Sequence, residues 1–232
     1  MPRSKKAPTK RTNRIRVHPL FAPIVSESTE VEYRTVEVPE RVVPFFGRKP
    51  SRLWHLGNPS LLNRPLVGIV SARAVESNPS LGTPELLGQL TRLQATFIGG
   101  WHSAPEKESL RILLGHAPQI VMCIAKNVHR FAFFQELKTL LNQDRLLLLT
   151  HCSPNAKRIS RDAAIRRNHL VAGLAHVLLV LAAPEESATF QLARSVIELR
   201  KPVFALEHPR NESLLASGAF PATFEGIQKV LQ

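Results

Sequence analysis

The feature that most constrains the fold is a regular alternation of short apolar segments with longer amphipathic segments, which begins at Leu66. Short apolar runs bounded by turn residues are typical of strands that are buried on both faces, and the segments between them have the length of helices. Strands are expected at 66–71, 95–98, 119–124, 145–150, 176–181 and 202–206, and helices at 84–93, 105–114, 131–141, 161–174, 188–199 and 222–231. This order predicts an α/β fold over residues 51–232: a doubly wound, Rossmann-like, mostly parallel sheet with helices on both faces.

Ligands of such sheets bind outside the carboxyl ends of the strands, so the loops that follow the strands are where a site is expected. Gly99 and Gly100 close the second strand and precede a helix. Two interpretations stay open for them: glycines let a ligand phosphate approach the backbone and the helix N-terminus, or they make a tight turn that binds nothing. Trp101 and His102 follow directly, and they are the best candidates for stacking on a base, although a tryptophan here also fits the core.

The first fifty residues differ from the rest. Residues 1–17 hold seven Lys/Arg and no acid, with almost nothing apolar, so they predict a disordered basic arm. The arm is expected either to contact phosphates or to be a solvated tail. Residues 18–50 mix glutamates with valines and prolines, and 31–38 alternates partly like an exposed strand. This segment is too short for a core of its own and is expected to wrap the main domain.

Charge narrows the class of partner. Lys and Arg number 31 against 18 Asp and Glu, a formal net charge of +13, which favours a polyanionic partner such as nucleic acid or an acidic membrane face. No apolar run reaches the ~20 residues of a membrane helix, and the basic N-terminus lacks the apolar stretch of a secretory signal. Two cysteines cannot make a disulfide framework, so a cytoplasmic protein is expected.

Several enzymatic signatures are absent. The chain contains no G-x-G-x-x-G after a strand, no G-x-x-x-x-G-K-[ST] and no G-x-S-x-G. The pair His151-Cys152 lacks further side chains at the spacing that a metal site needs. Cys123 is expected to pack in the core. No metal, cofactor or catalytic residue is therefore expected.

The strongest local signal is a run of basic residues that follows a strand end, at residues 157–169. Arginine can place two donors on one phosphate, and asparagine can bond a base edge or a backbone group. The same run also fits a solvated basic helix face, and its composition does not decide between the two.

A series of motifs, in matching order and spacing, resembles the DNA-processing protein A family (DprA, also called Smf). The segment RNHLVAGLAHVLLV, which begins at Arg167, is similar to the family's R-N-R-x-x-A-G-L-[SA]-x-x-x-x-V. Downstream, the family's S-G-[ST], G-[RK]-P-V-F-A-V-P-G and late G-A are matched by Ser187-Ala188-Thr189, by Arg200 to Ala205 and by Gly218-Ala219. Upstream, its Y-x-x-G-N, V-A-I-V-G-[ST]-R and S-G-G are matched by Trp54 to Asn58, by Val67 to Arg73 and by Ile98 to Gly100. The resemblance covers about residues 51–225.

The chain departs from this pattern at glycines and at one motif. Ser71 and Ala188 stand at glycine positions, Glu207-His208 replaces P-G, and Ser103 to Ser109 replaces G-I-D-x-x-A-H. A pocket that needs those glycines is expected to be narrowed or lost. The helical and winged-helix modules of many family members have no room here, so only the Rossmann-like core is expected.

The resemblance implies a protein that is not an enzyme, binds single-stranded DNA and helps to load a RecA-type recombinase in recombination or transformation; a homodimer is left open. The expected DNA-binding residues are Arg73, Lys157, Arg158, Arg161, Arg166, Arg167 and Asn168. A ligand loop is expected at Ser71, Gly99, Gly100, Trp101, His102, Ser187 and Thr189. Arg167 and Asn168 can instead brace the start of the helix, and mutation separates the two roles.

Two other functions remain as alternatives. One is a Rossmann module that senses or hydrolyses nucleotide derivatives, but the P-G-G-x-G-T-x-x-E of the lysine-decarboxylase-like (LOG) enzymes is missing, and only Glu185 and Glu186 stand near that place. The other is an accessory subunit that binds protein and whose basic surface is incidental.

Overall fold

The fold is built on a single nine-stranded sheet in the order β1-β2-β6-β5-β4-β3-β7-β8-β9, seen in a computed structural model that describes residues 33–46, 52–73, 83–127, 131, 133–154 and 160–232. Neighbouring strands from β6 to β9 are parallel, and β2 pairs antiparallel with both β1 and β6. The strands are β1 (Arg34–Val36), β2 (Leu53–Gly57), β3 (Leu66–Val70), β4 (Thr96–Gly99), β5 (Ile120–Ile124), β6 (Leu146–Thr150), β7 (Val177–Val180), β8 (Val203–Ala205) and β9 (Phe220–Pro221). The predicted doubly wound, mostly parallel sheet is confirmed.

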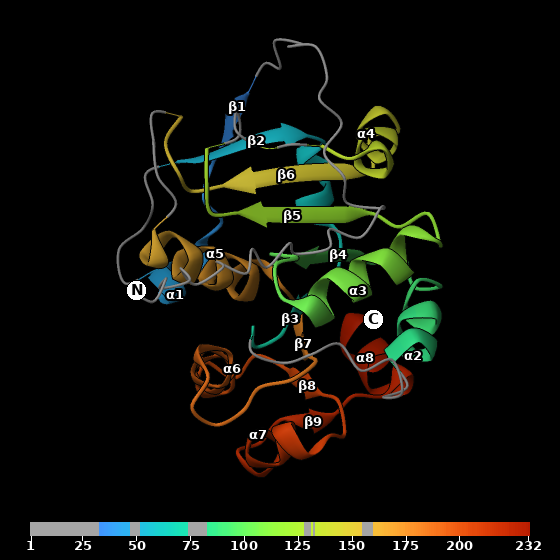
Figure 1. The fold of residues 1–232 in the computed structure, drawn as a ribbon, viewed down its shortest axis with the longest axis vertical. Coiled ribbons are helices and arrows are strands. Elements are labelled where there is room, and N and C mark those ends of the chain that lie inside the picture. Colours follow the sequence, from blue (N-terminus) through green and yellow to red (C-terminus); the bar gives the residue numbers. More distant parts are fainter. Residues whose placement is uncertain (1–32, 47–51, 74–82, 128–130, 132, 155–159) are drawn as a thin grey trace, which may run out of the picture.

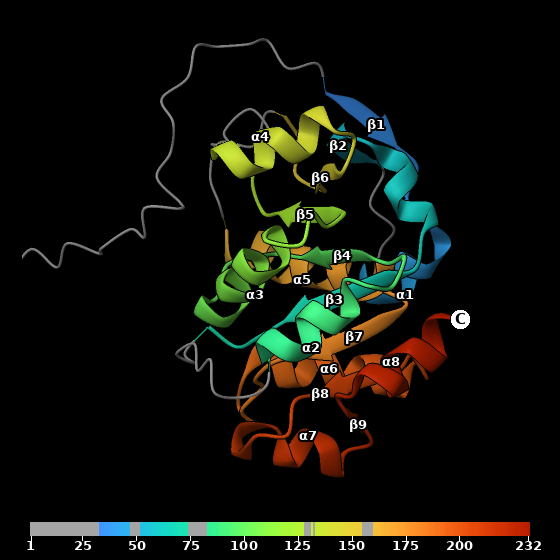
Figure 2. The ribbon, with the colours of Figure 1, turned by 90° about the vertical axis from the view of Figure 1, so that its right-hand side faces the viewer.

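Helices cover both faces of the sheet (Figures 1 and 2). On one face lie α2 (Thr83–Leu90), α3 (Ala104–Leu114), α4 (Gln135–Asn142) and α8 (Phe224–Leu231); on the other lie α1 (Val43–Phe46), α5 (Arg161–Leu174), α6 (Ala188–Glu198) and α7 (Glu212–Ala216). Along β5, Val121 and Cys123 enter the core on the α5 side, whereas Met122 and Ile124 enter the core on the α3 side. Both sides of each central strand are thus buried, which explains why these strands are apolar throughout rather than alternating.

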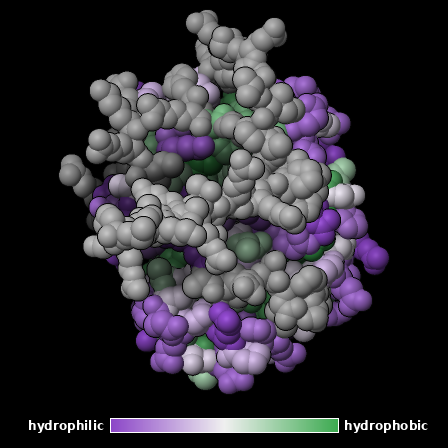
Figure 3. Space-filling view, in the orientation of Figure 1, coloured by the Kyte–Doolittle hydropathy of each residue, from purple (hydrophilic) through white to green (hydrophobic). Residues whose placement is uncertain are grey.

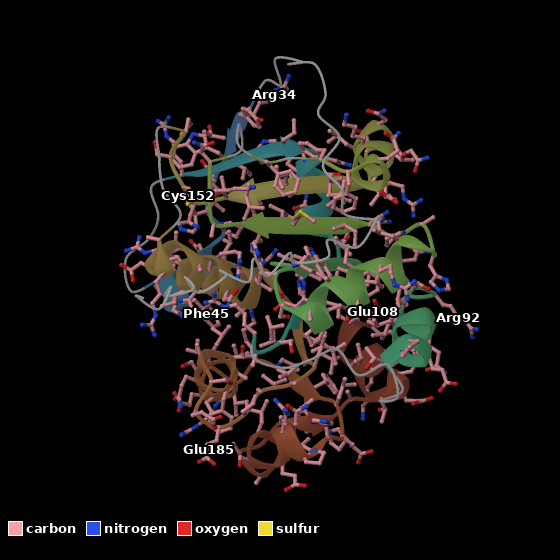
Figure 4. All side chains as sticks on the ribbon, in the orientation of Figure 1. Arg34, Phe45, Arg92, Glu108, Cys152 and Glu185 are labelled. Atoms are coloured by element: carbon pink, nitrogen blue, oxygen red, sulfur yellow. The ribbon has the colours of Figure 1, made fainter. Side chains whose placement is uncertain are left out.

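The segment 33–46 packs on the same core. Val42 and Phe45 are buried against α5, where Gly173 permits the close approach: a Cβ at Gly173 would lie 2.9 Å from the Cα of Val42. Lys201, which follows α6, donates hydrogen bonds from Nζ to the carbonyls of Ala172 (2.7 Å) and Gly173 (3.0 Å) near the end of α5. The last turn of α5 is therefore held from two directions. Figure 4 shows Phe45 beside this helix.

The predicted elements match the structure except at their ends. The helix expected from residue 131 begins only at Gln135, because Phe134 is extended and stands at the N-cap, and Phe131 instead packs edge-on against Phe133 at a centroid distance of 4.8 Å. The strand β2 was not expected at all. It is a five-residue antiparallel strand on which β1 is added as the edge of the sheet. Residues 1–32, with the expected basic arm, lie outside the described residues. No helix in the described part of the chain has the length and apolarity needed to cross a membrane.

Candidate nucleic-acid interface

The carboxyl ends of β3, β4 and β7 lie next to one another in the sheet. At this point the order in which the chain adds strands to the sheet changes direction. From β3 the chain adds β4, β5 and β6 on one side, and then returns to place β7 on the other side of β3. Such a switch point leaves a crevice beyond the strand ends, because the connections on its two sides run in opposite directions. The segments that enclose it here are Ser71–Arg73, His102–Ser103, Ser187–Thr189 and the first half of α5.

A carboxylate of the protein itself occupies the backbone donors of this crevice. Ser103 and Glu106 form a capping box at the start of α3, in which the Ser103 hydroxyl accepts a hydrogen bond from the Glu106 amide. The Glu106 carboxylate is buried, and it accepts hydrogen bonds from the backbone N–H groups of Ser71 (3.0 Å), His102 (2.7 Å) and Ser103 (3.3 Å). A helix N-terminus at a strand end is where a ligand phosphate would bind in this fold class, and Glu106 takes that place.

Arg167 lies deep in the same crevice. Only 6% of it is exposed, and its Nε and Nη2 atoms both donate to Oδ1 of Asn168, at 3.0 and 2.8 Å. Burial lowers the pKa of its guanidinium, an effect that the charge of nearby Glu106 opposes. Because guanidinium groups stay protonated in proteins, Arg167 is a fixed positive charge at the base of the crevice.

Gly99 and Gly100 make room for two side chains. A Cβ at Gly100 would lie 2.6 Å from Nε of Arg167, and one at Gly99 would lie 2.8 Å from the indole of Trp101. Trp101 itself has a φ of 53°, a left-handed conformation that is uncommon for a bulky residue, and its side chain is buried. The two glycines therefore let the Arg167 guanidinium and the Trp101 ring pack directly on the backbone at the end of β4.

Two cavities open side by side at this edge. The first, which we call the switch-point cavity, has a volume of about 260 Å³. It is lined by Ser71, Ala72, Arg73, His102, Ser103, Glu106, Ala164, Ile165, Arg167, Asn168, Ser187, Ala188 and Thr189. The second, the aromatic cavity, has a volume of about 410 Å³. It is lined by Arg73, Gly100, Trp101, His102, Lys107, Leu110, Met122, Ile124, Ala125, Lys126, Phe131, Phe134, Ala164 and Arg167. The cavities share Arg73, His102, Ala164 and Arg167, so they adjoin each other, and we call the two together the groove.

Positive charge dominates the groove. Besides Arg167, it holds the exposed side chains of Arg73 and Lys107 and the half-buried side chain of Lys126. Desolvation, followed by the charges of Arg167, Lys107, Lys126 and Arg73, lowers the pKa of His102 to about 4. His102 is therefore neutral at pH 7, although it projects toward solvent, and the groove's positive charge comes from its lysines and arginines.

The site residues expected from the sequence separate into three groups. The groove collects Arg73, Arg167 and Asn168 together with Ser71, Gly100, Trp101, His102, Ser187 and Thr189, while Gly99 lies under Trp101. Arg161 and Arg166 are exposed on α5 and line neither cavity. Lys157 and Arg158 lie outside the described residues. Figure 4 shows that Cys152, just past β6, lies at the same end of the sheet as these strand ends.

Sequence reasoning missed Glu106, Lys107, Lys126, Phe131 and Phe134. Glu106 had a signal: the spacing Ser103-x-x-Glu106 before an apolar helix face predicts a capping box. Lys126 follows the strand β5, whose loop was among those expected to form the site. Phe131 and Phe134 were assigned to a helix, so their place in the wall of a cavity was not apparent. In the described part of the chain, no cluster of three or more His, Cys, Asp or Glu residues could hold a metal ion.

Comparisons with known proteins agree with this fold. A solved structure of DNA processing protein A from Streptococcus pneumoniae superposes with a TM-score of 0.70 at 18% identity, over 87% of this chain and 74% of that one. The Helicobacter pylori protein, whose structure concerns its single-stranded DNA binding mode, gives a TM-score of 0.71 at 21% identity, over 87% and 97%. No individual curated protein sequence matches the chain significantly. The family model for DNA recombination-mediator protein A matches residues 33–223, and the chain belongs to that family.

Proposed function

We propose that the protein binds single-stranded DNA in the groove at the strand carboxyl ends and is not an enzyme. The observation that supports this most is the groove, whose lining combines Arg73, Lys107 and Lys126 with the buried Arg167. Exposed cations along a groove attract the phosphates of a single strand, and the release of counterions from the DNA drives the affinity. The exposed Arg166 extends the charge along α5.

The proposed roles of two adjacent arginines differ. Arg166 is exposed and is free to meet a phosphate, whereas Arg167 is buried and braces the groove through Asn168 and Gly100. Arg167 then contributes a fixed potential at the base of the groove and holds its shape.

Two hydroxyl groups of the groove serve as helix caps. The hydroxyls of Ser103 and Ser187 accept hydrogen bonds from backbone N–H groups of Glu106 and Phe190 at helix starts. The one acidic side chain among the described residues lining either cavity, Glu106, accepts bonds from three backbone N–H groups. A general base needs a carboxylate that can reach a reacting proton, so this arrangement favours binding over hydrolysis. Glu106 also stands where a nucleotide phosphate would sit, which disfavours a sensor of free nucleotides.

We further propose that the bound strand is handed to a RecA-type recombinase, in recombination or transformation. The family to which the chain belongs supports this role.

The test of DNA binding is a salt titration with a dT oligonucleotide, duplex DNA and dTMP. We expect the single strand to bind best and log affinity to fall linearly with log salt concentration. Arg73→Ala and Lys107→Ala should each lower the magnitude of that slope by about 0.7. The matched control is Arg92→Ala, which removes the same charge from an exposed residue at the far end of the molecule (Figure 4). Equal loss of affinity in the control and the groove variants would contradict the proposed site.

A further inference from the structure

Three basic side chains are placed around the amino ends of β3 and β7, the opposite ends of these strands from the groove. Arg41 belongs to the short 3-10 helix η2 (Glu40–Val42), His176 directly precedes β7, and Lys201 stands two residues before β8. They are far apart in the sequence, so the fold alone brings them to one edge of the sheet. Figure 3 shows the face of the molecule with the groove, where hydrophobic surface lies at the bottom of a hollow.

Each basic group is held by the backbone near these strand ends. Nη2 of Arg41 donates to the carbonyl oxygen of Leu62, four residues before β3, at 2.9 Å. Nδ1 of His176 accepts from the N–H of Leu66, the first residue of β3, at 3.0 Å, and the His176 N–H donates to the Leu66 carbonyl at 2.8 Å. The ammonium of Lys201 donates to the last turn of α5, which ends two residues before His176. The positions of all three groups are therefore fixed.

These bonds leave hydrogen-bond donors unused. A guanidinium has five N–H groups and an ammonium three. Within the described part of the chain, hydrogen bonds take one donor of Arg41 and two of Lys201. Because Nδ1 of His176 accepts a hydrogen bond, the neutral ring carries its hydrogen on Nε2. Arg41 and His176 are both exposed, so their remaining donors can meet a group that arrives from solvent.

The positive charge at this edge is not balanced by the residues that the structure describes, among which none of the three basic groups is paired with a carboxylate. Desolvation, followed by the charges of Arg41 and Lys201, lowers the pKa of His176. Desolvation, followed by the charge of Arg41, lowers the pKa of Lys201 to about 8. The groups are thus near enough to repel one another, and an anion between them would reverse this effect.

A phosphate group matches this arrangement. The planar guanidinium of Arg41 can place two donors on neighbouring oxygens of one anion, and His176 and Lys201 can each add one. A phosphate ester offers oxygens to all three groups and carries nearly two negative charges at pH 7. A carboxylate has only two oxygens and one charge, so it would leave donors and positive charge unmatched.

We propose that Arg41, His176 and Lys201 form a phosphate site at the amino edge of the sheet. The site does not rest on the proposed function, because it lies at the opposite ends of the strands from the groove and shares no residue with either cavity. The phosphate belongs either to a small phosphate compound or to the backbone of a nucleic acid, and the experiment distinguishes these two sources.

The test follows the histidine ring signals of the full chain by NMR while inorganic phosphate replaces chloride at constant ionic strength. Single His→Gln variants assign the signals. Bound phosphate favours the imidazolium form, so it should raise the pKa of His176, with half-saturation at about 1 mM phosphate. A pKa of His176 that is unchanged at about 10 mM phosphate would overturn the proposal.

A pair of variants locates the site. Arg41→Gln removes one charge and should weaken phosphate binding roughly tenfold or more, the equivalent of one charge-assisted hydrogen bond. Arg200→Gln is the matched control, because it removes the same charge from an exposed side chain that directly precedes Lys201. If Arg41→Gln binds phosphate as tightly as the unchanged protein, or if Arg200→Gln loses as much affinity, the proposed residues do not form the site. Thermal melting of each sample shows that the variant is folded.

A dT oligonucleotide in phosphate-free buffer identifies the source of the phosphate. Signals of His102 report binding in the groove, and signals of His176 report binding at the amino edge. A site for backbone phosphates responds at His176 to the oligonucleotide, whereas a site for small phosphate compounds responds there to inorganic phosphate alone. No response of His176 to either ligand overturns the phosphate site. No response of His102 to the oligonucleotide contradicts the proposed function instead.

Discussion

The two cavities share four residues and differ in how their polar groups are satisfied. In the switch-point cavity the backbone donors of Ser71, His102 and Ser103 all bond the internal carboxylate of Glu106. In the aromatic cavity the buried Nε1 of Trp101 bonds nothing. The first arrangement is complete without a ligand and the second is not. The part of the groove that this fold class most often gives to a ligand is thus the part that the protein has filled, and the open chemistry lies next to it.

The largest effect is expected from Arg167, which both cavities share. Arg167→Ala removes a buried side chain and its two bonds to Asn168, so we expect the free energy of unfolding to fall by about 3 kcal/mol. Chemical denaturation measures this loss directly. Arg166→Ala removes the same charge from an exposed neighbour and should change stability by less than about 0.5 kcal/mol while lowering the DNA salt slope. Equal destabilisation by both changes would show that Arg167 does not brace the groove.

The next largest effect is expected from Glu106, which lines the switch-point cavity and not the aromatic cavity. Glu106→Ala leaves the N–H groups of Ser71 and His102 without their acceptor and should cost about 2 kcal/mol of stability. The vacated position can then take an external anion, so millimolar inorganic phosphate should raise the melting temperature of this variant more than that of the unchanged protein. Glu106→Gln, which keeps one acceptor oxygen, should lose less stability. An identical change in melting temperature with phosphate in all three proteins would show that Glu106 does not act as an internal anion.

A smaller effect is expected at Gly100. Gly100→Ala places a Cβ 2.6 Å from Nε of Arg167 and pushes the guanidinium out of its position, at a cost of about 1 kcal/mol. Gly88→Ala is a control of opposite sign. Its Cβ would meet nothing closer than 3.8 Å on the helix α2, where alanine is favoured over glycine by about 1 kcal/mol. Melting curves of the two variants should therefore shift in opposite directions from the unchanged protein.

The smallest effect concerns pH. Desolvation, and then the charges of Arg166 and Arg167, lower the pKa of His151 to about 4. The unfolded chain takes up this proton near pH 6.5 and the folded protein only near pH 4, so stability falls as the pH falls through that interval. The ring is partly open to solvent, which limits the loss to about 1 kcal/mol. In His151→Gln the difference in unfolding free energy between pH 7 and pH 4.5 should be smaller, and an unchanged difference would contradict this assignment.

The sequence predicted the sheet because its central strands are buried on both faces and therefore read as apolar runs. It also placed α5 at its observed bounds, since the Ser160 N-cap and the extended Ala175 both lie at breaks in the pattern. The edge strand β1 was expected only as a partly alternating segment at 31–38, and its neighbour β2 was not expected. β1 is largely exposed, and β2 has only two buried residues, Leu53 and His55, so neither produces an apolar run.

The position of the candidate groove at the strand carboxyl ends was predictable, and the arrangement of its side chains was less so. Arg167 and Arg166 look alike as members of a basic run, yet Arg167 stands three, four and seven residues before Leu170, Val171 and Leu174, the spacing of one helix face. That spacing is typical of a buried position, whereas Arg167 was expected among the DNA-binding residues. The aromatic cavity had no such signal, because Phe131 and Phe134 come together with Trp101 only when the connections after β4 and β5 fold over the sheet edge.

The two cysteines differ in a way that gives the protein a natural attachment point for a reporter. Cys123 is fully buried in β5, and burial raises the pKa of its thiol to about 12, so a thiol reagent does not reach it in the folded state. Cys152 is partly exposed just past the end of β6, with its Sγ 3.7 Å from Nε2 of His151, at the end of the sheet where the strand ends form the groove (Figure 4). Burial raises the pKa of this thiol as well, but a reagent can reach it from solvent. Maleimide chemistry on the unmodified sequence therefore places a single dye beside the proposed path of the DNA, and the arrival and departure of a strand can be followed as a change in its fluorescence.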